Sequence, residues 1–514
     1  MKLHDLLKLI QPKKIYSKGG FWHEVEISSI HYRAQEVLPG GLFVAVKGIA
    51  ADGHDFIDMA LARGAKAIVT QKPLDADSII IEVENTRRAL AQISSEFYHN
   101  PSKKLVLIGI TGTNGKTTTA CLIESILKKA GIRAGVIGTI NYRYAGKVFN
   151  NPMTTPESAD LQKIFAEMLE HGITHIVLEV SSHAIELNRV DCCNFDIGVF
   201  TNITQDHLDF HGNMETYWTC KKRFFTEILK PGNGDTKRTA VLNCDNKYGR
   251  ELFEELPGNN ISTGNSNNNM IYPEVLKQDL TGMEGTFFSP EGNYKIKSSL
   301  AGQYNVENLL CAAGTGFALS IRTDIIASGL EKVKRVPGRL ERIDNDFQRF
   351  VYVDYAHTPD ALKNVLLTLK SLTKKKLICL FGCGGDRDKT KRPLMGEIAA
   401  ELSDLLIITS DNPRTEHPLD IINQILAGIG KESSLRINES ELNKGRWRLP
   451  DGIKGSLVEP DREKAIFLSI KASLPGDTII IAGKGHETYQ IIGDKRLSFD
   501  DREVAKAALR DIRW

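Results

Sequence analysis

The chain has 514 residues, which at the usual domain size corresponds to about three domains. Its 41% hydrophobic content is enough to build buried cores, and a formal net charge of +2 lacks the basic excess of a nucleic-acid-binding protein. Eight cysteines without a CxxC pair do not make a disulfide framework in so long a chain. We therefore expect reduced thiols, a cytoplasmic protein and no nucleic-acid partner.

The sequence shows no targeting or membrane segment. The stretch from Met1 to Lys13 has a few apolar residues but no long apolar core and no cleavage site of small residues, so we expect no signal peptide. No apolar run approaches the roughly 20 residues that span a bilayer. The chain is therefore expected to have no membrane partner.

Short apolar runs recur along the chain, each followed by a loop of glycine or small polar residues and then by a helical pattern. The runs are not alternating, which is typical of parallel strands buried on both faces. The helix after the first run places Leu122, Ile126 and Ala130 on one face. This pattern predicts an α/β fold with doubly wound parallel sheets. The runs are Leu105–Ile110, His175–Val180, Ile197–Phe200, Ala240–Leu242, Phe350–Val353, Lys376–Phe381, Leu405–Thr409 and Thr478–Ala482.

Two breaks in this pattern suggest domain boundaries. Asn100 and Pro101 precede the first strand of the series, and Pro337 with Gly338 precedes a second series of strands. The expected domains are residues 1–101, 102–337 and 338–514. Polar composition predicts surface loops at Asn259–Met270 and Glu432–Gly455.

A phosphate-binding loop is the strongest single signal in the sequence. It reads Thr111-Gly112-Thr113-Asn114-Gly115-Lys116-Thr117-Thr118. The loop follows a strand and opens a helix, whose N-terminus favours anions. Lys116 would neutralise the β- and γ-phosphates of a nucleotide, and the Thr117 hydroxyl would hold Mg²⁺. The loop is a shorter variant of the usual pattern, because Ile110 stands where glycine is expected.

Acidic residues follow two predicted strands that are successive in the chain. Glu179 lies at the end of one strand, and Asp206 and Asp209 flank His207 after the next. Carboxylates at the carboxyl ends of parallel strands point into the ligand crevice, where they could complete Mg²⁺ coordination. His207 alone would more often be an ordinary packed or surface histidine.

Nine motifs together carry a family resemblance, and they run in the same order as in the family from about residue 25 to residue 502. They read GTNGKTT, EVSSH, TNITQDHLDFHG, AGQYNVEN, VPGRLE, VDYAHTPD, GCGGDRD, SDNPRTEHP and GKGHE. The chain resembles the Mur ligase family. The phosphate loop is shared with folylpolyglutamate synthases, whereas GKGHE and DNPR are typical of the members that add a diamino acid.

The resemblance implies three domains, which bind a uridine nucleotide, ATP and an amino acid in chain order, the last in a Rossmann-like fold. It implies an ATP-dependent ligase with Mg²⁺ that phosphorylates the D-Glu carboxylate of UDP-MurNAc-L-Ala-D-Glu. The amino group of meso-diaminopimelate then displaces phosphate from this acyl phosphate. Phosphorylation is needed because a carboxylate is a poor acylating agent, so catalysis is mainly positioning and charge neutralisation. We expect small-molecule substrates and a monomer.

The resemblance also assigns roles to individual residues of this sequence. It implies a carbamylated lysine at Lys221, four residues after Tyr217, with the neighbouring Lys222 as the rival. The implied catalytic residues are Lys116, Glu179, His207 and Lys221, and the metal ligands are Thr117, Glu179, His207 and carbamylated Lys221. ATP contacts are implied for Gly112, Thr113, Asn114, Gly115, Lys116, Thr117, Thr118, Asn305, Asn308, Arg339 and Asp354. Contacts to the UDP-linked substrate are implied for Thr154, Thr155, Ser181 and Arg189.

Arg414 in the DNPR motif is the residue on which amino-acid choice is expected to depend. Diaminopimelate ends in a carboxylate and an ammonium, whereas lysine ends in an ammonium alone, and an arginine offers a planar fork for the carboxylate. Arg387 would be a second cation. The implied amino-acid site is Arg387, Asp411, Asn412, Pro413, Arg414, Gly483 and Glu487.

Three alternatives follow from the same residues. The chain could be a lysine-adding or other Mur-type ligase, a folylpolyglutamate-type ligase, or a nucleotide switch without ligase chemistry. Arg414 and GKGHE argue against the first two, and the acids Glu179 and Asp354 argue against the third. Two departures from the family pattern, Ala34 and Leu187, affect the expected contacts to the UDP-linked substrate.

Overall fold

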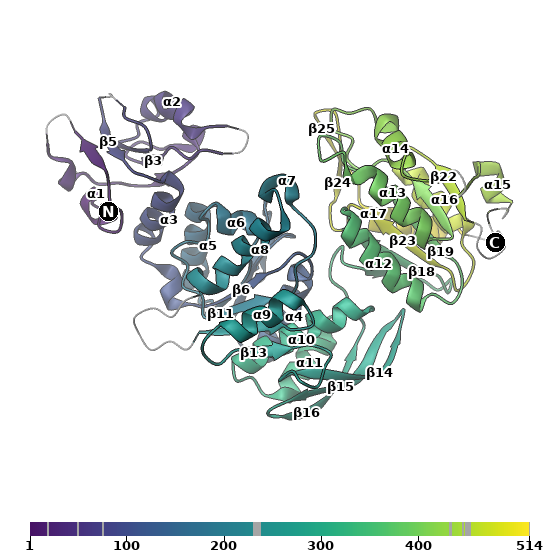
Figure 1. Ribbon diagram of the computed structural model, residues 1–514. Coiled ribbons are helices and arrows are strands. Elements are labelled where there is room, and N and C mark those ends of the chain that lie inside the picture. The colour runs from purple at the N-terminus through teal and green to yellow at the C-terminus, as the bar shows by residue number, and fades with distance from the viewer. Residues whose placement is uncertain are drawn as a thin grey trace.

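The computed structural model describes residues 1–17, 20–48, 51–74, 77–229, 238–430, 434–444, 447 and 454–512. Three bodies follow one another from the N-terminus to the C-terminus (Figure 1). The predicted divisions near residues 101 and 337 fall between their main sheets. No helix within these ranges combines the length and apolar character needed to cross a bilayer.

The N-terminal body is built on a five-stranded sheet in the order β1-β5-β4-β3-β2. Its strands pair in parallel except for β1, which lies antiparallel to β5. Alternate residues of β3 enter different cores, Leu42 on one face and Phe43 on the other, so the sheet is covered on both sides. The elements are β1 Lys14–Tyr16, β2 Ile30–His31, β3 Leu42–Val44, β4 Ala67–Thr70, β5 Ile79–Glu82, α1 Leu3–Leu7, α2 Ile57–Ala62 and α3 Thr86–Phe97.

The central body contains an eight-stranded sheet in the order β13-β12-β11-β6-β10-β7-β8-β9. The strands from β13 to β7 are parallel, which confirms the prediction made from the unbroken apolar runs. The strands are β6 Val106–Thr111, β7 Ala134–Ile137, β8 Tyr142–Tyr144, β9 Lys147–Phe149, β10 His175–Glu179, β11 Ile197–Phe200, β12 Thr239–Asn243 and β13 Ile261–Thr263. Because β13 lies within 259–270, the prediction of a loop over that whole stretch was wrong.

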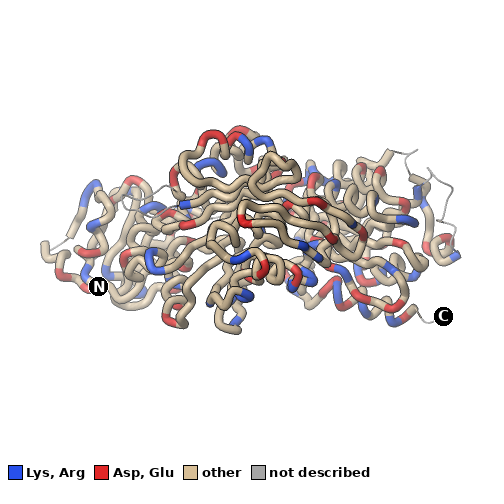
Figure 2. Tube along the Cα trace, turned by 90° about the horizontal axis from the view of Figure 1, so that it is seen from below, with Lys and Arg blue, Asp and Glu red and all other residues tan. Residues whose placement is uncertain are grey.

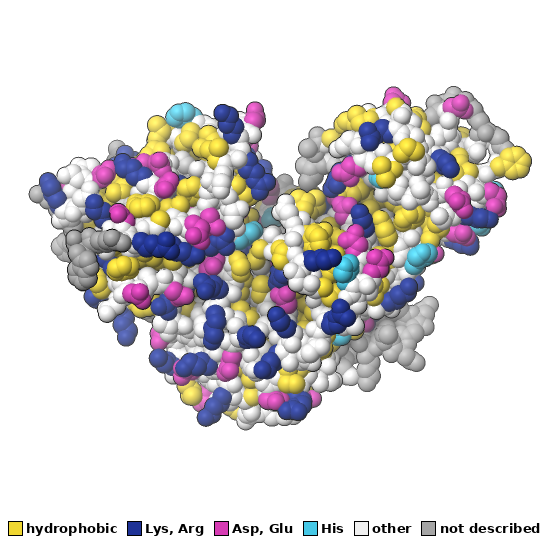
Figure 3. Space-filling view, turned by 180° about the vertical axis from the view of Figure 1, so that it is seen from behind, with side chains coloured by type: hydrophobic (Ala, Val, Ile, Leu, Met, Phe, Trp, Pro, Cys, Tyr) yellow, Lys and Arg dark blue, Asp and Glu magenta, His cyan; other side chains and the backbone are white. Residues whose placement is uncertain are grey.

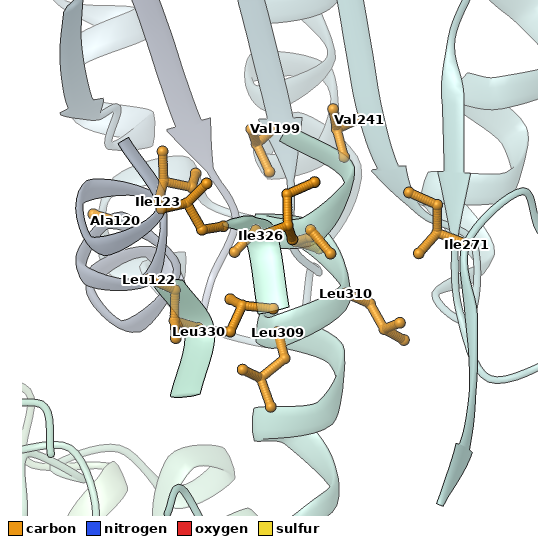
Figure 4. Packing of buried hydrophobic residues seen from close by; sticks show 14 of the residues in the cluster. Ala120, Leu122, Ile123, Val199, Val241, Ile271, Leu309, Leu310, Ile326 and Leu330 are labelled. Carbon is orange, nitrogen blue, oxygen red and sulfur yellow. The ribbon is translucent and has the colours of Figure 1, made fainter. Parts of the chain in front are cut away.

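Helices cover both faces of this central sheet. On one face α4, α10 and α11 pack together, and Leu122, Leu309 and Ile326 of these helices belong to one buried cluster that also contains Val199 of β11 (Figure 4). A Cβ on Gly329 would lie 2.6 Å from the Cα of Ile126, so glycine allows α11 to approach α4 closely. The helices are α4 Lys116–Lys129, α5 Ser158–Glu170, α6 Ser182–Glu186, α7 Leu208–His211, α8 Met214–Arg223, α9 Lys247–Glu255, α10 Gln303–Ala318 and α11 Thr323–Lys332.

A separate three-stranded antiparallel sheet extends from the central body below the C-terminal body (Figure 1). Its strands are β14 Tyr272–Asp279, β15 Gly282–Ser289 and β16 Gly292–Ser298. The Tyr352 hydroxyl of the C-terminal body donates a hydrogen bond of 2.5 Å to the Leu280 carbonyl in the β14–β15 turn. The β14–β15 turn of the central body is therefore in direct contact with the C-terminal body.

The C-terminal body has a seven-stranded sheet in the order β17-β18-β23-β19-β20-β22-β21, parallel except at β17. This arrangement confirms the predicted second series of strands. The strands are β17 Glu341–Ile343, β18 Phe350–Asp354, β19 Leu377–Phe381, β20 Leu405–Ile408, β21 Leu435–Arg436, β22 Gly455–Val458 and β23 Thr478–Ala482. The helices are α12 Pro359–Leu372, α13 Lys391–Leu402, α14 Pro418–Leu426, α15 Glu439–Asn443, α16 Arg462–Ala472 and α17 Asp501–Asp511, and a hairpin consists of β24 Tyr489–Ile492 and β25 Lys495–Ser498.

The predicted surface loop at 432–455 is more structured than its composition indicated. Among its described residues, β21 extends the sheet edge, α15 follows, and the Trp447 side chain is buried in the core. Residues 432–433, 445–446 and 448–453 of that prediction lie outside the described ranges. Basic and acidic residues are interspersed over all three bodies, as Figure 2 shows.

Candidate active site

The predicted phosphate loop joins β6 to α4. Gly112 has a φ angle of 154°, and a Cβ there would lie 1.9 Å from Oγ1 of Thr201, so the close approach of the loop to the next strand requires glycine. The Lys116 ammonium donates hydrogen bonds to the carbonyls of Gly112 at 2.8 Å and Thr113 at 2.9 Å. Burial lowers the pKa of Lys116. The loop thus holds its lysine beside the N-terminus of α4, where an anion is favoured.

Glu179 lies at the end of β10 and faces the start of α4. Its side chain is 1% exposed and accepts hydrogen bonds from the hydroxyls of Thr117 at 3.0 Å and Thr139 at 2.8 Å. Its other oxygen accepts the backbone N–H of Thr139 at 3.1 Å. The predicted magnesium ligands Thr117 and Glu179 are therefore in direct contact.

Lys221 is 1% exposed on α8 and reaches the same loop from the other side. Its Nζ donates a hydrogen bond to the Gly112 carbonyl at 3.0 Å and lies 4.7 Å from the centre of the Tyr217 ring. Burial, together with the nearby Lys116 ammonium, holds the pKa of Lys221 well below its ordinary value. The lowered pKa therefore favours the neutral amine that carbamylation requires.

His207 lies near these lysines in a left-handed backbone conformation, with a φ angle of 54°. Its Nε2 is 3.5 Å from the Asp206 carboxylate, and its ring contacts that of His183 with 5.0 Å between centroids. Burial lowers the pKa of His207, and the Asp206 carboxylate opposes this shift. A neutral imidazole at this position can donate or accept one proton beside the phosphate loop.

The oxygen donors fit magnesium brought in with a nucleotide. Within the described ranges, no three His, Cys, Asp or Glu side chains gather as a preformed metal site. Magnesium usually takes one or two carboxylates and completes its coordination with water and substrate phosphates. The hydroxyl of Thr117 and the carboxylate of Glu179 provide that kind of partial ligand set.

Two residues of the C-terminal body contact the phosphate-loop region across the junction. Arg339 stacks on Tyr355 at 4.7 Å, and its Nη2 donates a hydrogen bond of 3.4 Å to Oγ1 of Thr117. Asp360, in the first turn of α12, accepts a hydrogen bond of 2.7 Å from the Thr204 hydroxyl. The predicted ATP residue Arg339 is therefore within reach of the phosphate loop.

Three other predicted ATP residues are buried and bonded within the protein. The Asp354 carboxylate accepts the backbone N–H groups of Leu340 at 2.5 Å and Ala356 at 2.8 Å, and burial raises its pKa. On α10, Nδ2 of Asn308 donates a hydrogen bond of 3.1 Å to Oδ1 of Asn305. The polar groups of these three side chains are therefore bonded to neighbouring groups of the protein.

The residues predicted to meet the UDP-linked substrate gather around the end of β10; they are Thr154, Thr155, Ser181 and Arg189. The Thr155 hydroxyl donates a hydrogen bond of 2.7 Å to the Glu179 carbonyl. Arg189 forms an ion pair of 2.9 Å with Glu157, which also pairs at 3.1 Å with Arg87 of the N-terminal body. This site therefore adjoins the junction between the first two bodies. Of the two residues that depart from the family pattern, Ala34 is buried in a core and Leu187 is the C-cap of α6.

The predicted amino-acid residues lie at the carboxyl ends of strands β19, β20 and β23. Arg414 has a left-handed backbone with a φ angle of 52°, and its Nη1 donates a hydrogen bond of 2.7 Å to the Gly385 carbonyl. Arg387 is exposed on the facing loop. A Cβ on Gly483 would lie 2.6 Å from the carboxylate of Asp411, so these two residues are in close contact. The structure brings the predicted set together on one edge of the sheet.

Glu487 already has a cationic partner in the protein. The fully buried ammonium of Lys484 donates hydrogen bonds to Oε2 of Glu487 at 3.2 Å and to Oδ1 of Asn412 at 3.0 Å. Asn412 in turn donates to Glu487 at 3.0 Å. The carboxylate of Glu487, a residue of the predicted amino-acid site, is therefore already bound by Lys484 and Asn412.

The phosphate-side and amino-acid-side residues belong to different bodies. A notch opens at the top of the space-filling view between the C-terminal body and the N-terminal body (Figure 3). Sequence reasoning missed several polar residues beside these sites, namely Thr139, Glu157, Asp360 and Lys484. Asp360 and Lys484 stand inside quoted motifs and could have been found there, whereas Thr139 and Glu157 carry no local signal.

Comparison with known domain families gives three matches along the chain. Residues 26–98 match the Mur ligase family catalytic domain, residues 110–316 the Mur ligase middle domain, and residues 338–485 the Mur ligase glutamate ligase domain. The matched segments follow one another in the order of the three bodies.

Similar proteins cover the whole chain. It is 44% identical to a UDP-N-acetylmuramoyl-L-alanyl-D-glutamate--2,6-diaminopimelate ligase of Geobacter metallireducens, over 100% of this chain and 99% of that protein. It is 42% identical to the ligase of the same name from Bacillus licheniformis, over 100% of both chains. A solved structure with that enzyme name superposes with a TM-score of 0.66 at 29% identity, covering 96% of this chain and 97% of the other. The chain therefore belongs to the Mur ligase family.

Proposed function

We propose that this chain is an ATP-dependent ligase that joins meso-diaminopimelate to the D-glutamyl carboxylate of UDP-MurNAc-L-Ala-D-Glu, in the synthesis of a peptidoglycan precursor. The observation that carries the proposal is the pairing of two sites in one chain. Thr117 of the phosphate loop contacts Glu179, and the loop with Arg414 lies at the strand ends of the next body. The names of the similar proteins support the choice of substrates.

The reaction has two balanced steps. A carboxylate oxygen of the peptide attacks the γ-phosphorus of ATP, ADP leaves, and an acyl phosphate forms. The amine nitrogen of the diamino acid then attacks the acyl carbon, phosphate leaves, and the nitrogen loses a proton. ATP therefore supplies the leaving group, and the overall products are the amide, ADP and phosphate.

The residues of the phosphate side act by charge and position. Lys116 would exchange its loop carbonyls for phosphate oxygens and so neutralise charge as it develops. Mg²⁺, when bound, would neutralise phosphate charge, with Thr117, Glu179, His207 and a carbamate on Lys221 as its proposed protein ligands. Arg339 reaches this region from the next body, so the two steps depend on how the bodies approach one another.

The residues of the amino-acid side select the nucleophile. The Arg414 guanidinium would pair with the far carboxylate of diaminopimelate, a group that lysine lacks. Arg387 on the facing loop would add a second cation, and Asp411 would receive the ammonium of the same end. The attacking amine at the other end of diaminopimelate would then point toward the phosphate loop.

We also propose a cytoplasmic monomer. The cysteines at 121, 192, 193, 220, 244, 311, 379 and 383 are all free thiols in the structure, which suits a reducing compartment. ATP and nucleotide-linked precursors are the expected small-molecule partners.

An assay of ATP turnover tests the proposal. We expect ADP and phosphate to form only when UDP-MurNAc-L-Ala-D-Glu and a diamino acid are both present, with meso-diaminopimelate preferred over L-lysine by at least about tenfold in kcat/KM. Mass spectrometry should show one amide for each ADP. Preference for lysine would favour a lysine-adding ligase, and phosphate release without the peptide would favour a nucleotide switch.

A further inference from the structure

An ion pair between a fully buried arginine and a partly buried glutamate lies directly behind the loops that carry Arg387 and Arg414. Arg392 of α13 donates from Nη1 to Oε2 of Glu416 and from Nη2 to Oε1, both at 2.9 Å. The Arg392 side chain is 0% exposed and that of Glu416 is 15% exposed. A two-point contact between planar groups fixes orientation as well as distance. Because desolvation offsets much of the attraction in a buried pair, its main effect is on geometry.

The pair is bonded to the backbone of the loop before it. Oε1 of Glu416 also accepts the Asp386 N–H at 2.7 Å, and Nη2 of Arg392 donates to the Gly384 carbonyl at 3.0 Å. Arg387, the second predicted cation, directly follows Asp386. The pair therefore fixes the path of residues 384–386.

The same pair is continuous with the loop of Arg414. Glu416 lies two residues after Arg414, and its N–H donates to the Pro413 carbonyl at 3.1 Å. The Arg414 side chain donates to the Gly385 carbonyl at 2.7 Å, inside the stretch that Arg392 and Glu416 hold. The position of the Arg414 guanidinium thus depends on where the pair places Gly385.

The loop of Gly385 and the loop of Arg414 pack tightly against each other. A Cβ on Gly385 would lie 1.9 Å from the Pro413 carbonyl oxygen. Asp386 accepts hydrogen bonds from the side chain of Thr415 at 2.8 Å and from its backbone at 3.2 Å. A displaced pair would therefore move both loops together.

We propose that Arg392 and Glu416 are positioning residues that set amino-acid selectivity by fixing the guanidinium of Arg414. This inference rests on the proposed function, in which Arg414 binds the far carboxylate of the diamino acid. A shift of about 1 Å in a binding group is enough to lose much of its contribution. The pair stays charged through the neutral range, because the Arg392 guanidinium lowers the pKa of Glu416 to about 2.

Glu416→Gln tests the role with nearly unchanged shape. We expect the KM for meso-diaminopimelate to rise about tenfold and the preference over L-lysine to fall about tenfold, with kcat and the KM for ATP within about twofold of wild type. Arg392→Met should give the same pattern, and Arg392→Lys should recover part of it because the charge remains.

Arg349→Met is the matched control. Arg349 is also a buried arginine of the C-terminal body, but it donates to Ser473 at the amino ends of the strands, on the opposite edge of the sheet. We expect this variant to lower the melting temperature without changing the KM for the diamino acid. Glu416→Gln with a lower melting temperature and wild-type selectivity would overturn the positioning role.

A double-mutant cycle separates an effect through Arg414 from a general disturbance. If the pair acts by placing that guanidinium, Glu416→Gln should cause no further loss of selectivity in an Arg414→Ala background. Additive losses would contradict the proposal. A wild-type enzyme that ignores diaminopimelate would overturn the proposed function itself, whereas a selective wild type with an equally selective Glu416→Gln variant would overturn the positioning role alone.

Discussion

Lys221→Ala should lower kcat by about a thousandfold while the variant remains folded and still binds ATP. The reason is the position of this side chain, which is buried and donates to the phosphate-loop carbonyl of Gly112 at 3.0 Å. Carbon dioxide reacts with a neutral amine, and burial favours that form by lowering the pKa of Lys221. The resulting carbamate would place a negative group beside the phosphates, suited to a second magnesium ion.

Rescue and mass measurement test this expectation. Added acetate or formate should restore part of the rate of Lys221→Ala, because a short carboxylate can occupy the space of the carbamate. The intact wild-type protein should gain the mass of one CO₂ in bicarbonate buffer, and the variant should not. A full rate in Lys221→Ala, or a rate that carboxylates leave unchanged, would refute the carbamate.

Lys222→Ala is the matched control for this prediction. Lys222 is the adjacent residue on α8, is more exposed, and pairs with Glu255 on the surface. Exposed ion pairs contribute little, so this variant should keep nearly the full rate. A large loss in Lys222→Ala with none in Lys221→Ala would transfer the role to the neighbouring lysine.

Arg414→Ala should remove most of the preference for diaminopimelate over lysine. A charged hydrogen-bonded contact to the far carboxylate contributes about 2 kcal/mol, which corresponds to about thirtyfold in kcat/KM. The loss should appear as a higher KM for diaminopimelate, with the KM for lysine and the affinity for ATP nearly unchanged. Competition between the two amino acids, followed by mass analysis of the product, measures the preference directly.

Two further variants define what the Arg414 measurement means. Arg414→Lys keeps the charge but loses the planar fork, so it should recover only part of the preference. Arg496→Ala removes a cation of the nearby hairpin that stacks on Tyr489 at 3.7 Å, and it should leave the preference intact. Unchanged selectivity in Arg414→Ala would refute the role of this residue.

The sequence predicted the architecture well because its signals are local. Unbroken apolar runs identified strands such as β10 and β19, whose parallel pairing the structure confirms. The same reasoning was wrong at 259–270 and 432–455, where polar composition concealed β13, β21 and α15. Short edge strands carry few apolar residues, so composition alone does not distinguish them from loops.

The candidate site was only partly predictable. Motifs pointed to Lys116, Glu179 and Arg414 as candidates. They did not indicate that Lys484 forms an ion pair with Glu487, or that Arg392 pairs with Glu416 behind the Arg414 loop. Such partners are ordinary charged residues until the fold buries them, since their chemistry depends on surroundings supplied by other segments.

By itself, the sequence determined the α/β class, the phosphate loop and the resemblance to the Mur ligases. These depend on apolar periodicity and on residues adjacent in the chain. Only the tertiary structure decided which distant groups meet, such as Thr117 with Glu179, 62 positions apart, and Arg339 with Thr117, 222 apart. The physical reason is that sheet order and helix packing bring strand ends together, and no local pattern encodes that order.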